Sequence, residues 1–386
     1  MSVYLDHAAT TPMSDVAIAA MNASLRKLGN PSSLHTDGRA TRKDVEDARE
    51  VIAHSIDCVP SEVIFTGSGT EADNAAIKGL FWYSKKKVIL VSSIEHHAVL
   101  DPAHWLVEHE GAELIEIPVT ATGIVDLVFL AEVVAKRAGE IALISVMHSN
   151  NETGVIQPIA EIVKIAGEIP VHCDAVQSFT KVPLSFKKLG LFAMTISAHK
   201  VGGPLGIGAL ILRRAVELPP LLHGGGQERD IRSGTVNAPA IVAFAAAVAA
   251  REYDAEKVQA LREKFESGVL ALRSDAVING ASAPRLPGIS NITFPGTQSD
   301  SLLLLMDAEK VSCSTGAACS AGVHRPSHVL MAMGLSDVVA QSSLRFSFGA
   351  TSTEADVDFA LSILPAVIER GLAAHSVGRR WRSSPP

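Results

Sequence analysis

The sequence lacks the features that mark secreted, membrane and nucleic-acid-binding proteins. Its 4 cysteines in 386 residues are too few and too scattered for a disulfide framework. The longest apolar stretch, 238–250, is too short to span a bilayer, and the N-terminus has no signal-peptide pattern. Lysine and arginine (34) are outnumbered by aspartate and glutamate (41), so the composition shows no excess of basic residues of the kind that nucleic-acid binding needs. We therefore expect a cytoplasmic protein that binds no membrane and makes no direct contact with nucleic acid.

Aromatic residues are also scarce, at 5% of a chain that is 47% hydrophobic. An aliphatic core of this kind suits an α/β fold better than an all-β sandwich. Short aliphatic runs alternate with helical stretches, which predicts a mostly parallel sheet covered by helices on both faces. The strands are expected at 63–65, 88–91, 114–117, 141–144, 171–173, 194–196 and 209–212. The glycine-rich connection 202–208 predicts that the last two strands form an antiparallel pair.

The character of the chain changes after about residue 255. Prolines at 284, 287 and 295 interrupt short strands, and helices are expected over 299–307 and 353–373. A chain of 386 residues is long enough for two domains. We expect a large domain at 13–255 and a smaller α+β domain formed by 1–12 and 256–386.

Polar segments follow five of the expected strands. Ligands of open α/β sheets bind outside the carboxyl ends of the strands, so these segments are expected to meet at one site. The segments are 66–71, 92–97, 149–152, 174–177 and 197–200.

Two of these segments carry residues suited to an aldehyde cofactor. Lys200 closes an apolar strand and can form an imine, whereas a surface lysine is the alternative. Asp174 closes the preceding strand and can keep the cofactor's ring nitrogen protonated. An aspartate that caps the next helix is the alternative for Asp174.

Two further loops add a phosphate site and an imidazole. Segment 67–71 follows a strand and opens a helix, where free N–H groups and the Thr70 hydroxyl favour a phosphate. An ordinary glycine turn with Thr70 as the helix N-cap is the alternative. His96 can stack on a flat ring and move protons. The pair His96 and His97 has no further ligands at metal-binding spacing, so we expect no metal site.

The C-terminal part offers a nucleophile and an anion-binding group. Segment 312–322 lacks any large apolar residue and contains Cys313 and Cys319, which compete for the role of nucleophile. A small buried hydrophobe is the alternative for either cysteine. Arg345 interrupts a strand-like run, where its guanidinium suits capture of a substrate carboxylate or a structural salt bridge.

Together these segments resemble the class V, fold-type I enzymes that depend on pyridoxal 5'-phosphate (PLP), in particular the NifS/IscS-type cysteine desulfurases. The resemblance runs nearly from end to end. The matching segments are 4–12, 29–35, 65–74, 95–96, 150–152, 174–177, 197–200, 224–228, 232–235, 316–319 and 342–347.

The resemblance implies a role for each matching residue. Lys200 would bind the PLP aldehyde, Asp174 would pair with the ring nitrogen, and His96 would stack on the ring. The ring hydroxyl side would be contacted by Asn151 and Gln177, and the phosphate by Gly69, Thr70, Ser197 and His199. Thr235 would reach the phosphate of the other subunit's cofactor, which implies a homodimer. Substrate would be held by Asn30, Asn151 and Arg345.

The implied reaction converts L-cysteine to L-alanine and leaves sulfur on Cys319 as a persulfide. An acceptor protein, either an iron–sulfur scaffold or a tRNA-thiolation enzyme, would take that sulfur. The extra thiol of Cys313, and a C-terminus without the longer tail of some relatives, leave the acceptor open. A selenocysteine lyase, an aminotransferase and a PLP-fold scaffold without activity are the competing hypotheses.

Overall fold

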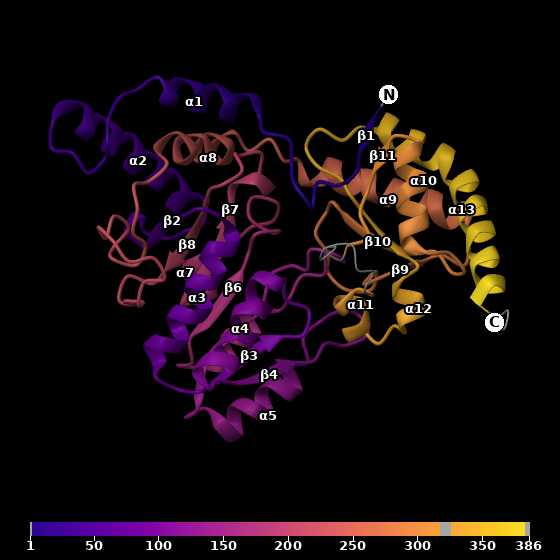
Figure 1. Cartoon of the computed structure of the whole chain (residues 1–386), viewed down its shortest axis with the longest axis horizontal. Helices are drawn as coiled ribbons and strands as arrows, with labels where there is room; N and C mark the ends of the chain where they lie inside the picture. The colour runs from indigo at the N-terminus through magenta and orange to yellow at the C-terminus, as the bar shows by residue number, and fades with distance from the viewer. Residues whose placement is uncertain (1, 317–325, 383–386) are drawn as a thin grey trace.

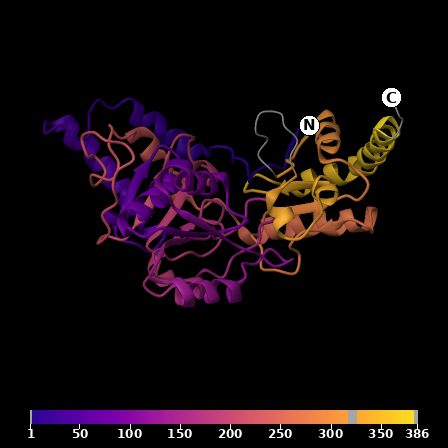
Figure 2. The same cartoon turned by 60° about the horizontal axis from the view of Figure 1, so that its bottom comes forward.

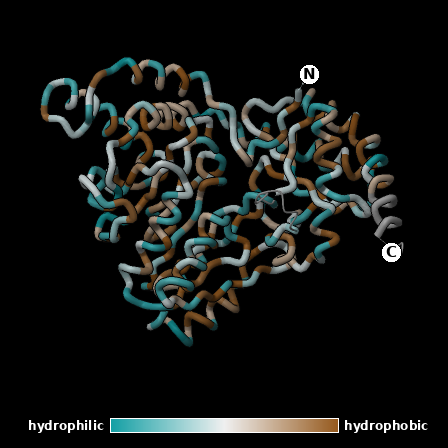
Figure 3. The backbone as a smooth tube through the Cα atoms, in the orientation of Figure 1, coloured by the Kyte–Doolittle hydropathy of each residue, from teal (hydrophilic) through white to brown (hydrophobic). Residues whose placement is uncertain are grey.

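The computed structural model describes residues 2–316 and 326–382, with side chains described as far as Ala374. The described chain forms two lobes that lie side by side (Figures 1 and 2). Hydrophobic residues recur along the chain in both lobes (Figure 3), and each lobe has its own core.

The first lobe is built on a seven-stranded sheet of order β2-β8-β7-β6-β5-β3-β4. All seven expected strands are confirmed. They are β2 (Val63–Thr66), β3 (Val88–Ser92), β4 (Glu113–Ile117), β5 (Ile141–Ser145), β6 (Val171–Asp174), β7 (Ala193–Ser197) and β8 (Gly208–Leu212). The pairs among β3 to β7 are parallel, whereas β8 is antiparallel to both β7 and β2. The expected antiparallel pair at the end of the sheet is therefore confirmed.

Helices cover both faces of this sheet because alternate strand residues point to opposite faces. Phe65 packs in one core cluster with helices α2, α5, α6 and α8, whereas Ile64 packs in another with α3 and α4. The helices of this lobe are α1 (Asp15–Leu25), α2 (Thr36–Ser55), α3 (Gly69–Ser84), α4 (His97–Glu110), α5 (Leu127–Arg137), α6 (Ile159–Ala166), α7 (Phe186–Leu189) and α8 (Ala238–Ala250), with the short turns η1 (Pro60–Glu62) and η2 (Ala198–Lys200).

The second lobe combines small sheets with packed helices. Strand β10 (Ile289–Thr293) lies between β9 (Val277–Ile278) and β12 (Ser343–Ser347), and all three are antiparallel. Strand β1 (Val3–Tyr4) pairs in parallel with β11 (Val311–Ser312). The helices are α9 (Ala255–Leu272), α10 (Ser299–Ala308), α11 (His328–Ala332), α12 (Asp337–Ala340) and α13 (Glu354–Arg382). None of the helices in the described ranges is both long and apolar enough to cross a membrane.

The N-terminal residues belong physically to this second lobe. Val3 and Leu5 are fully buried in the cluster that also contains Phe265 and Phe346. The division into 13–255 and 1–12 with 256–386 stays a prediction, which the separate core clusters support.

Residues 6–11 connect the two lobes and lie beside the strand ends. The His7 N–H donates to the Ser347 carbonyl of β12, and the Thr11 N–H donates to the His199 carbonyl of η2. The backbone carbonyls of Ala8 and Ala9 are thereby brought to the carboxyl end of β7, where the candidate site lies.

Candidate active site

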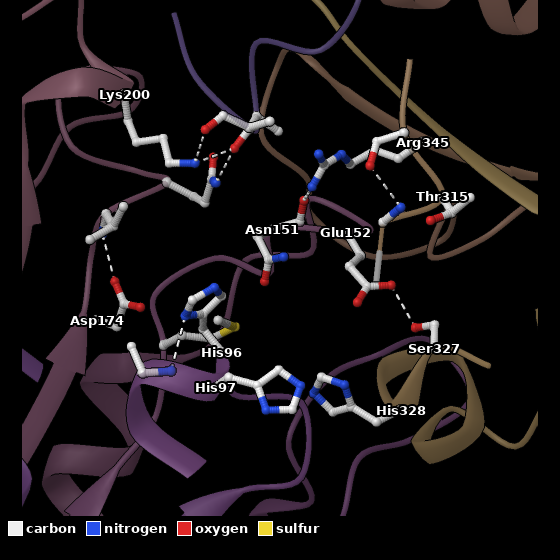
Figure 4. A pocket seen from close by; sticks show the side chains of 18 of the residues that line it. His96, His97, Asn151, Glu152, Asp174, Lys200, Thr315, Ser327, His328 and Arg345 are labelled. Carbon is white, nitrogen blue, oxygen red and sulfur yellow. Dashed lines mark hydrogen bonds between the residues drawn. The ribbon is translucent and has the colours of Figure 1, made fainter. Parts of the chain in front are cut away.

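A cavity of about 610 Å³ lies between the two lobes, at the carboxyl ends of the central strands. Its wall brings together most of the predicted site residues (Figure 4). These are Gly69, Thr70, His96, Asn151, Asp174, Gln177, Ser197, His199, Lys200 and Arg345. Asn30 and Thr235 are exposed and do not line it. Cys319 lies outside the described residues, although Gly316, which lines the cavity, precedes it by three positions.

Lys200 ends the short turn η2 and points its amine into the cavity (Figure 4). The Nζ atom donates to the carbonyls of Ala8 at 2.5 Å and Ala9 at 2.7 Å. Burial, together with the positive charge of Arg345, lowers the pKa of Lys200 to about 8. About one tenth of this amine is therefore uncharged at pH 7, far more than for an ordinary lysine, and the surface-lysine alternative is wrong.

Asp174 is the last residue of β6 and is almost fully buried. Its Oδ1 atom accepts from the Val176 N–H at 2.8 Å, and burial raises the pKa of the carboxyl to about 6. The next helix, α7, starts only at Phe186, so the helix-cap alternative is wrong. Within the described ranges, no lysine or arginine forms an ion pair with Asp174, so the carboxylate is available for a cationic ligand.

The first turn of α3 forms a cradle lined by glycine. Ser68 is the N-cap of this helix and accepts from the Glu71 N–H at 3.0 Å, so Thr70 lies inside the helix and is not its cap. A Cβ atom on Gly69 would lie 3.1 Å from Val176 Cγ2, which leaves little room for a side chain. The first turn of a helix leaves backbone N–H groups without intrahelical acceptors, which makes this cradle suitable for a phosphate.

His96 caps α4 and is held as a neutral imidazole. Its Nδ1 atom accepts from the Ala98 N–H at 3.1 Å, so the proton of the neutral ring resides on Nε2. Burial and the nearby charge of Lys200 lower the pKa of His96 to about 4. His96 is an exposed residue whose side chain lines the cavity. No group of three or more metal-ligating side chains is found among the described residues.

Arg345 forms the structural salt bridge that its position in the sequence suggested, and its role toward a substrate stays a prediction. One guanidinium nitrogen donates to the Asn151 carbonyl at 2.9 Å, and another forms an ion pair with Asp6 at 2.8 Å. The side chain also lines the cavity, and its buried Nε–H has no acceptor in the described part of the chain. A buried guanidinium with an unused N–H is suited to an anionic ligand such as a carboxylate.

Cys313 is placed as a small hydrophobe. It is 8% exposed, it packs in the core of the second lobe, and burial raises the pKa of its thiol to about 12. A nucleophilic cysteine needs a thiolate, so Cys313 is unsuited to that role.

Two carboxylates of the cavity wall carried no sequence-based assignment. Glu152 is 1% exposed and accepts from the Ser327 hydroxyl at 2.5 Å, and its burial raises its pKa (Figure 4). Its place in the polar segment 149–152, at the end of an expected strand, could have predicted that Glu152 lies at the site. Asp73 is 2% exposed on the apolar face of α3, and burial followed by the charge of Asp174 raises its pKa. A carboxylate at a helical position flanked by Ala72, Ala76 and Ile77 was the corresponding signal.

Comparisons with known proteins decide the family. The family model described as aminotransferase class-V matches residues 3–359. The chain belongs to the aminotransferase class-V family. It is 50% identical to an IscS-like cysteine desulfurase of Mycobacterium tuberculosis, over 96% of this chain and 97% of the relative. It is 41% identical to the cysteine desulfurase IscS of Dictyoglomus turgidum, over 98% of each chain.

Solved structures agree with this class V assignment. A NifS-like protein superposes with a TM-score of 0.88 at 35% identity, covering 96% of this chain and all of that one. A NifS-like protein from Rickettsia africae superposes with a TM-score of 0.87 at 33% identity and the same coverage. The expected fold-type I α/β architecture is thus confirmed.

Enzymes of this family depend on PLP, and the cavity fits that cofactor. It offers an amine of lowered pKa, a buried carboxylate that forms no ion pair with any described lysine or arginine, and a helix N-terminus where glycine leaves space. These groups match an aldehyde, a pyridinium nitrogen and a phosphate, respectively. The three groups line one continuous cavity, which suits a single ligand that carries all three functions.

Proposed function

We propose that this protein is a cysteine desulfurase that converts L-cysteine to L-alanine and leaves the sulfur on Cys319 as a persulfide. One observation carries the proposal: Lys200, Asp174 and Arg345 line one cavity, and so does Gly316, which immediately precedes the segment containing Cys319. The full-length relatives named cysteine desulfurase support it. A solved structure named SspA in complex with cysteine, 33% identical with a TM-score of 0.81, supports the choice of substrate.

The proposed cofactor site uses the residues of the cavity wall. Lys200 holds the aldehyde carbon, Asp174 the ring nitrogen, and His96 the ring face. The ring-oxygen side is held by Asn151 and Gln177, and the phosphate by Gly69, Thr70, Ser197 and His199. All of these residues line the cavity, which supports the assignment.

Bound PLP supplies an electron sink for the substrate's Cα and Cβ atoms. The residues of this chain orient the substrate and move its protons. Arg345 binds the substrate carboxylate through its unused Nε–H, and the uncharged amine of Lys200 accepts the Cα proton. The neutral ring of His96 carries its proton on Nε2 and can give it up toward the cavity.

The sulfur-transfer step balances without an added oxidant or reductant. The Cβ–S bond of the substrate breaks, an S–S bond forms at Cys319, and the thiol of Cys319 becomes a persulfide. The electron pair of the broken Cβ–S bond stays with Cβ. Of the two thiol protons, one ends on Cβ and the other on the persulfide, so cysteine plus thiol gives alanine plus persulfide. Because the attacking species is a thiolate, the thiol pKa of Cys319 has to be lowered when it reaches the site.

We further propose that the enzyme works as a homodimer in the cytoplasm and passes sulfur to an acceptor protein for iron–sulfur cluster assembly or tRNA thiolation. Thr235 is exposed rather than turned into its own cavity, which supports a contact with the partner's phosphate. The ion pair of Arg232 with Glu71, 2.9 Å long, fixes the segment before Thr235 against the start of α3. Asn30 is likewise exposed, and its substrate contact stays a proposal.

Formation of alanine and sulfide from L-cysteine in the presence of a reductant tests the proposal. We expect both products in equal amounts from the PLP-loaded protein and neither from the Lys200→Ala variant. The Lys188→Ala variant, altered at an exposed lysine, is the matched control. A loaded protein that forms no alanine from L-cysteine but turns over selenocysteine or a keto acid would contradict the proposal.

A further inference from the structure

Lys181 is a buried lysine to which the proposed chemistry gives no role. It lies in the turn after β6, only 9% of its surface is exposed, and it does not line the cavity. No carboxylate forms an ion pair with it in the described part of the chain. Its Nζ atom donates instead to the side-chain oxygen Oε1 of Gln177, at 3.4 Å.

The Gln177 amide is therefore oriented from both of its ends. In its ammonium form Lys181 can only donate a hydrogen bond, and that form requires the oxygen Oε1 on its own side. The carbonyl of Ala8 can only accept, and Gln177 Nε2 donates to it at 2.9 Å. An amide can be flipped without a change of shape, but here the two partners demand the same orientation.

The orientation matters because Gln177 lines the cavity whereas Lys181 stands behind it. With one Nε2 hydrogen on Ala8, the second N–H of the amide remains to act as a donor to a ligand. The oxygen on the PLP ring is an acceptor that carries negative charge. A donor placed beside it stabilises this charge, whereas an amide oxygen placed there would repel it.

The electrostatic surroundings make Lys181 responsive to such an anion. Burial, followed by the charges of Lys200 and Arg345, lowers the pKa of Lys181 to about 7. Its charge in turn contributes to the lowered pKa values of His7 and His199. An anion held in the cavity would raise the pKa of Lys181 again and favour its ammonium form, which can only donate a hydrogen bond.

We propose that Lys181 is a positioning residue that locks the Gln177 amide with its nitrogen toward the ring oxygen of PLP. The inference rests on the proposed function, because it assumes that PLP occupies this cavity. Lys181 acts through Gln177, and it touches neither the substrate nor the cofactor.

The test is a pH titration of the visible absorbance of the PLP-loaded protein, compared with a Lys181→Met variant. Methionine retains most of the side-chain length and removes the donor. Without Lys181, the Gln177 amide N–H is no longer fixed beside the negative ring oxygen, which becomes less stable. We therefore expect the apparent pKa of the absorbance change to rise by about one unit. Dissociation of PLP should also become faster. Lys188→Met is the matched control at an exposed lysine, and Lys181→Arg, which keeps a donor, should restore the wild-type titration.

A double-mutant cycle separates positioning from a direct effect of charge. In a Gln177→Met background, Lys181→Met should cause no further shift, because the amide that it orients is absent. Equal shifts in both backgrounds, or no shift in the wild-type background, would overturn the inference. Lys181→Ala serves as a second neutral variant if the methionine variant does not fold. A wild-type protein that develops no visible absorbance with PLP would instead refute the proposed function itself.

Discussion

The lowered pKa of Lys200 can be measured directly on the cofactor-free protein. Burial and the charge of Arg345 lower this pKa from 10.5 to about 8. At pH 7, about one tenth of the side chains would then carry a free amine, against about 3 in 10,000 for an unperturbed lysine. The structure thus predicts about 300 times more of the reactive form at neutral pH.

Competitive acylation with a small anhydride, followed by peptide mass spectrometry, reports the free amine of each lysine. Labelling of Lys200 should rise with pH through a midpoint near 8 and level off above it, because only the deprotonated amine reacts. Exposed Lys188 provides the internal reference for the reagent. Without PLP in the assay, the titration of the cofactor itself cannot disturb the result.

Two substitutions should move this midpoint in opposite directions. Arg345→Gln removes a positive charge and leaves Asp6 unpaired, so the pKa of Lys200 should rise. Asp174→Asn removes a negative charge, so the pKa of Lys200 should fall. A wild-type midpoint at the ordinary value of 10.5, or shifts of the opposite sign, would refute the electrostatic reasoning.

Three further predictions concern residues around the site. Glu228→Gln removes a buried charge that lies 2.8 Å from Arg49, so the free energy of unfolding should fall by about 3 kcal/mol. Denaturant titration measures this, and an unchanged free energy of unfolding would contradict the prediction. Cys313→Ala should lower the free energy of unfolding by about 1 kcal/mol and leave the persulfide yield per subunit unchanged. The intact mass reports this yield, and loss of the persulfide would show that Cys313 takes part. Thr235→Val should speed PLP loss about tenfold on dilution, as expected for one lost hydrogen bond to a charged group. Unchanged retention would count against a site shared between subunits.

The central sheet could be predicted from sequence because its strands are short, aliphatic and separated by helical segments. The run 88–91, for example, is fully buried on both faces, so no polar residue blurs its pattern. Polar residues at the strand ends could likewise be located, since parallel strands bring their carboxyl ends to one edge.

Local pattern alone could not decide which polar group caps which helix. Ser68 and Thr70 are both acceptable caps, and only the backbone of the first turn shows that Ser68 takes this position. Asp174 was ambiguous for the same reason. An aspartate after a strand can cap a following helix or accept from a nearby backbone N–H, and only the structure shows that it accepts from Val176.

Contacts between distant segments were beyond reach without the structure. Ser327 donates to Glu152 from 175 residues away, and Gln177 donates to Ala8 from 169 residues away. Lys181 belongs to a turn without periodicity, so nothing in its neighbourhood predicts that it is buried. Lys181 is linked to the segment that connects the two lobes only through Gln177, which donates to the Ala8 carbonyl.

Mass spectrometry of the intact, PLP-loaded protein after treatment with L-cysteine, without reductant, tests the central claim most directly. The account predicts a gain of one sulfur atom per subunit, mapped to Cys319, and absent from both the Lys200→Ala and the Cys319→Ser variants. A protein that retains PLP but gains no sulfur, or that still gains it in the Cys319→Ser variant, would contradict the account.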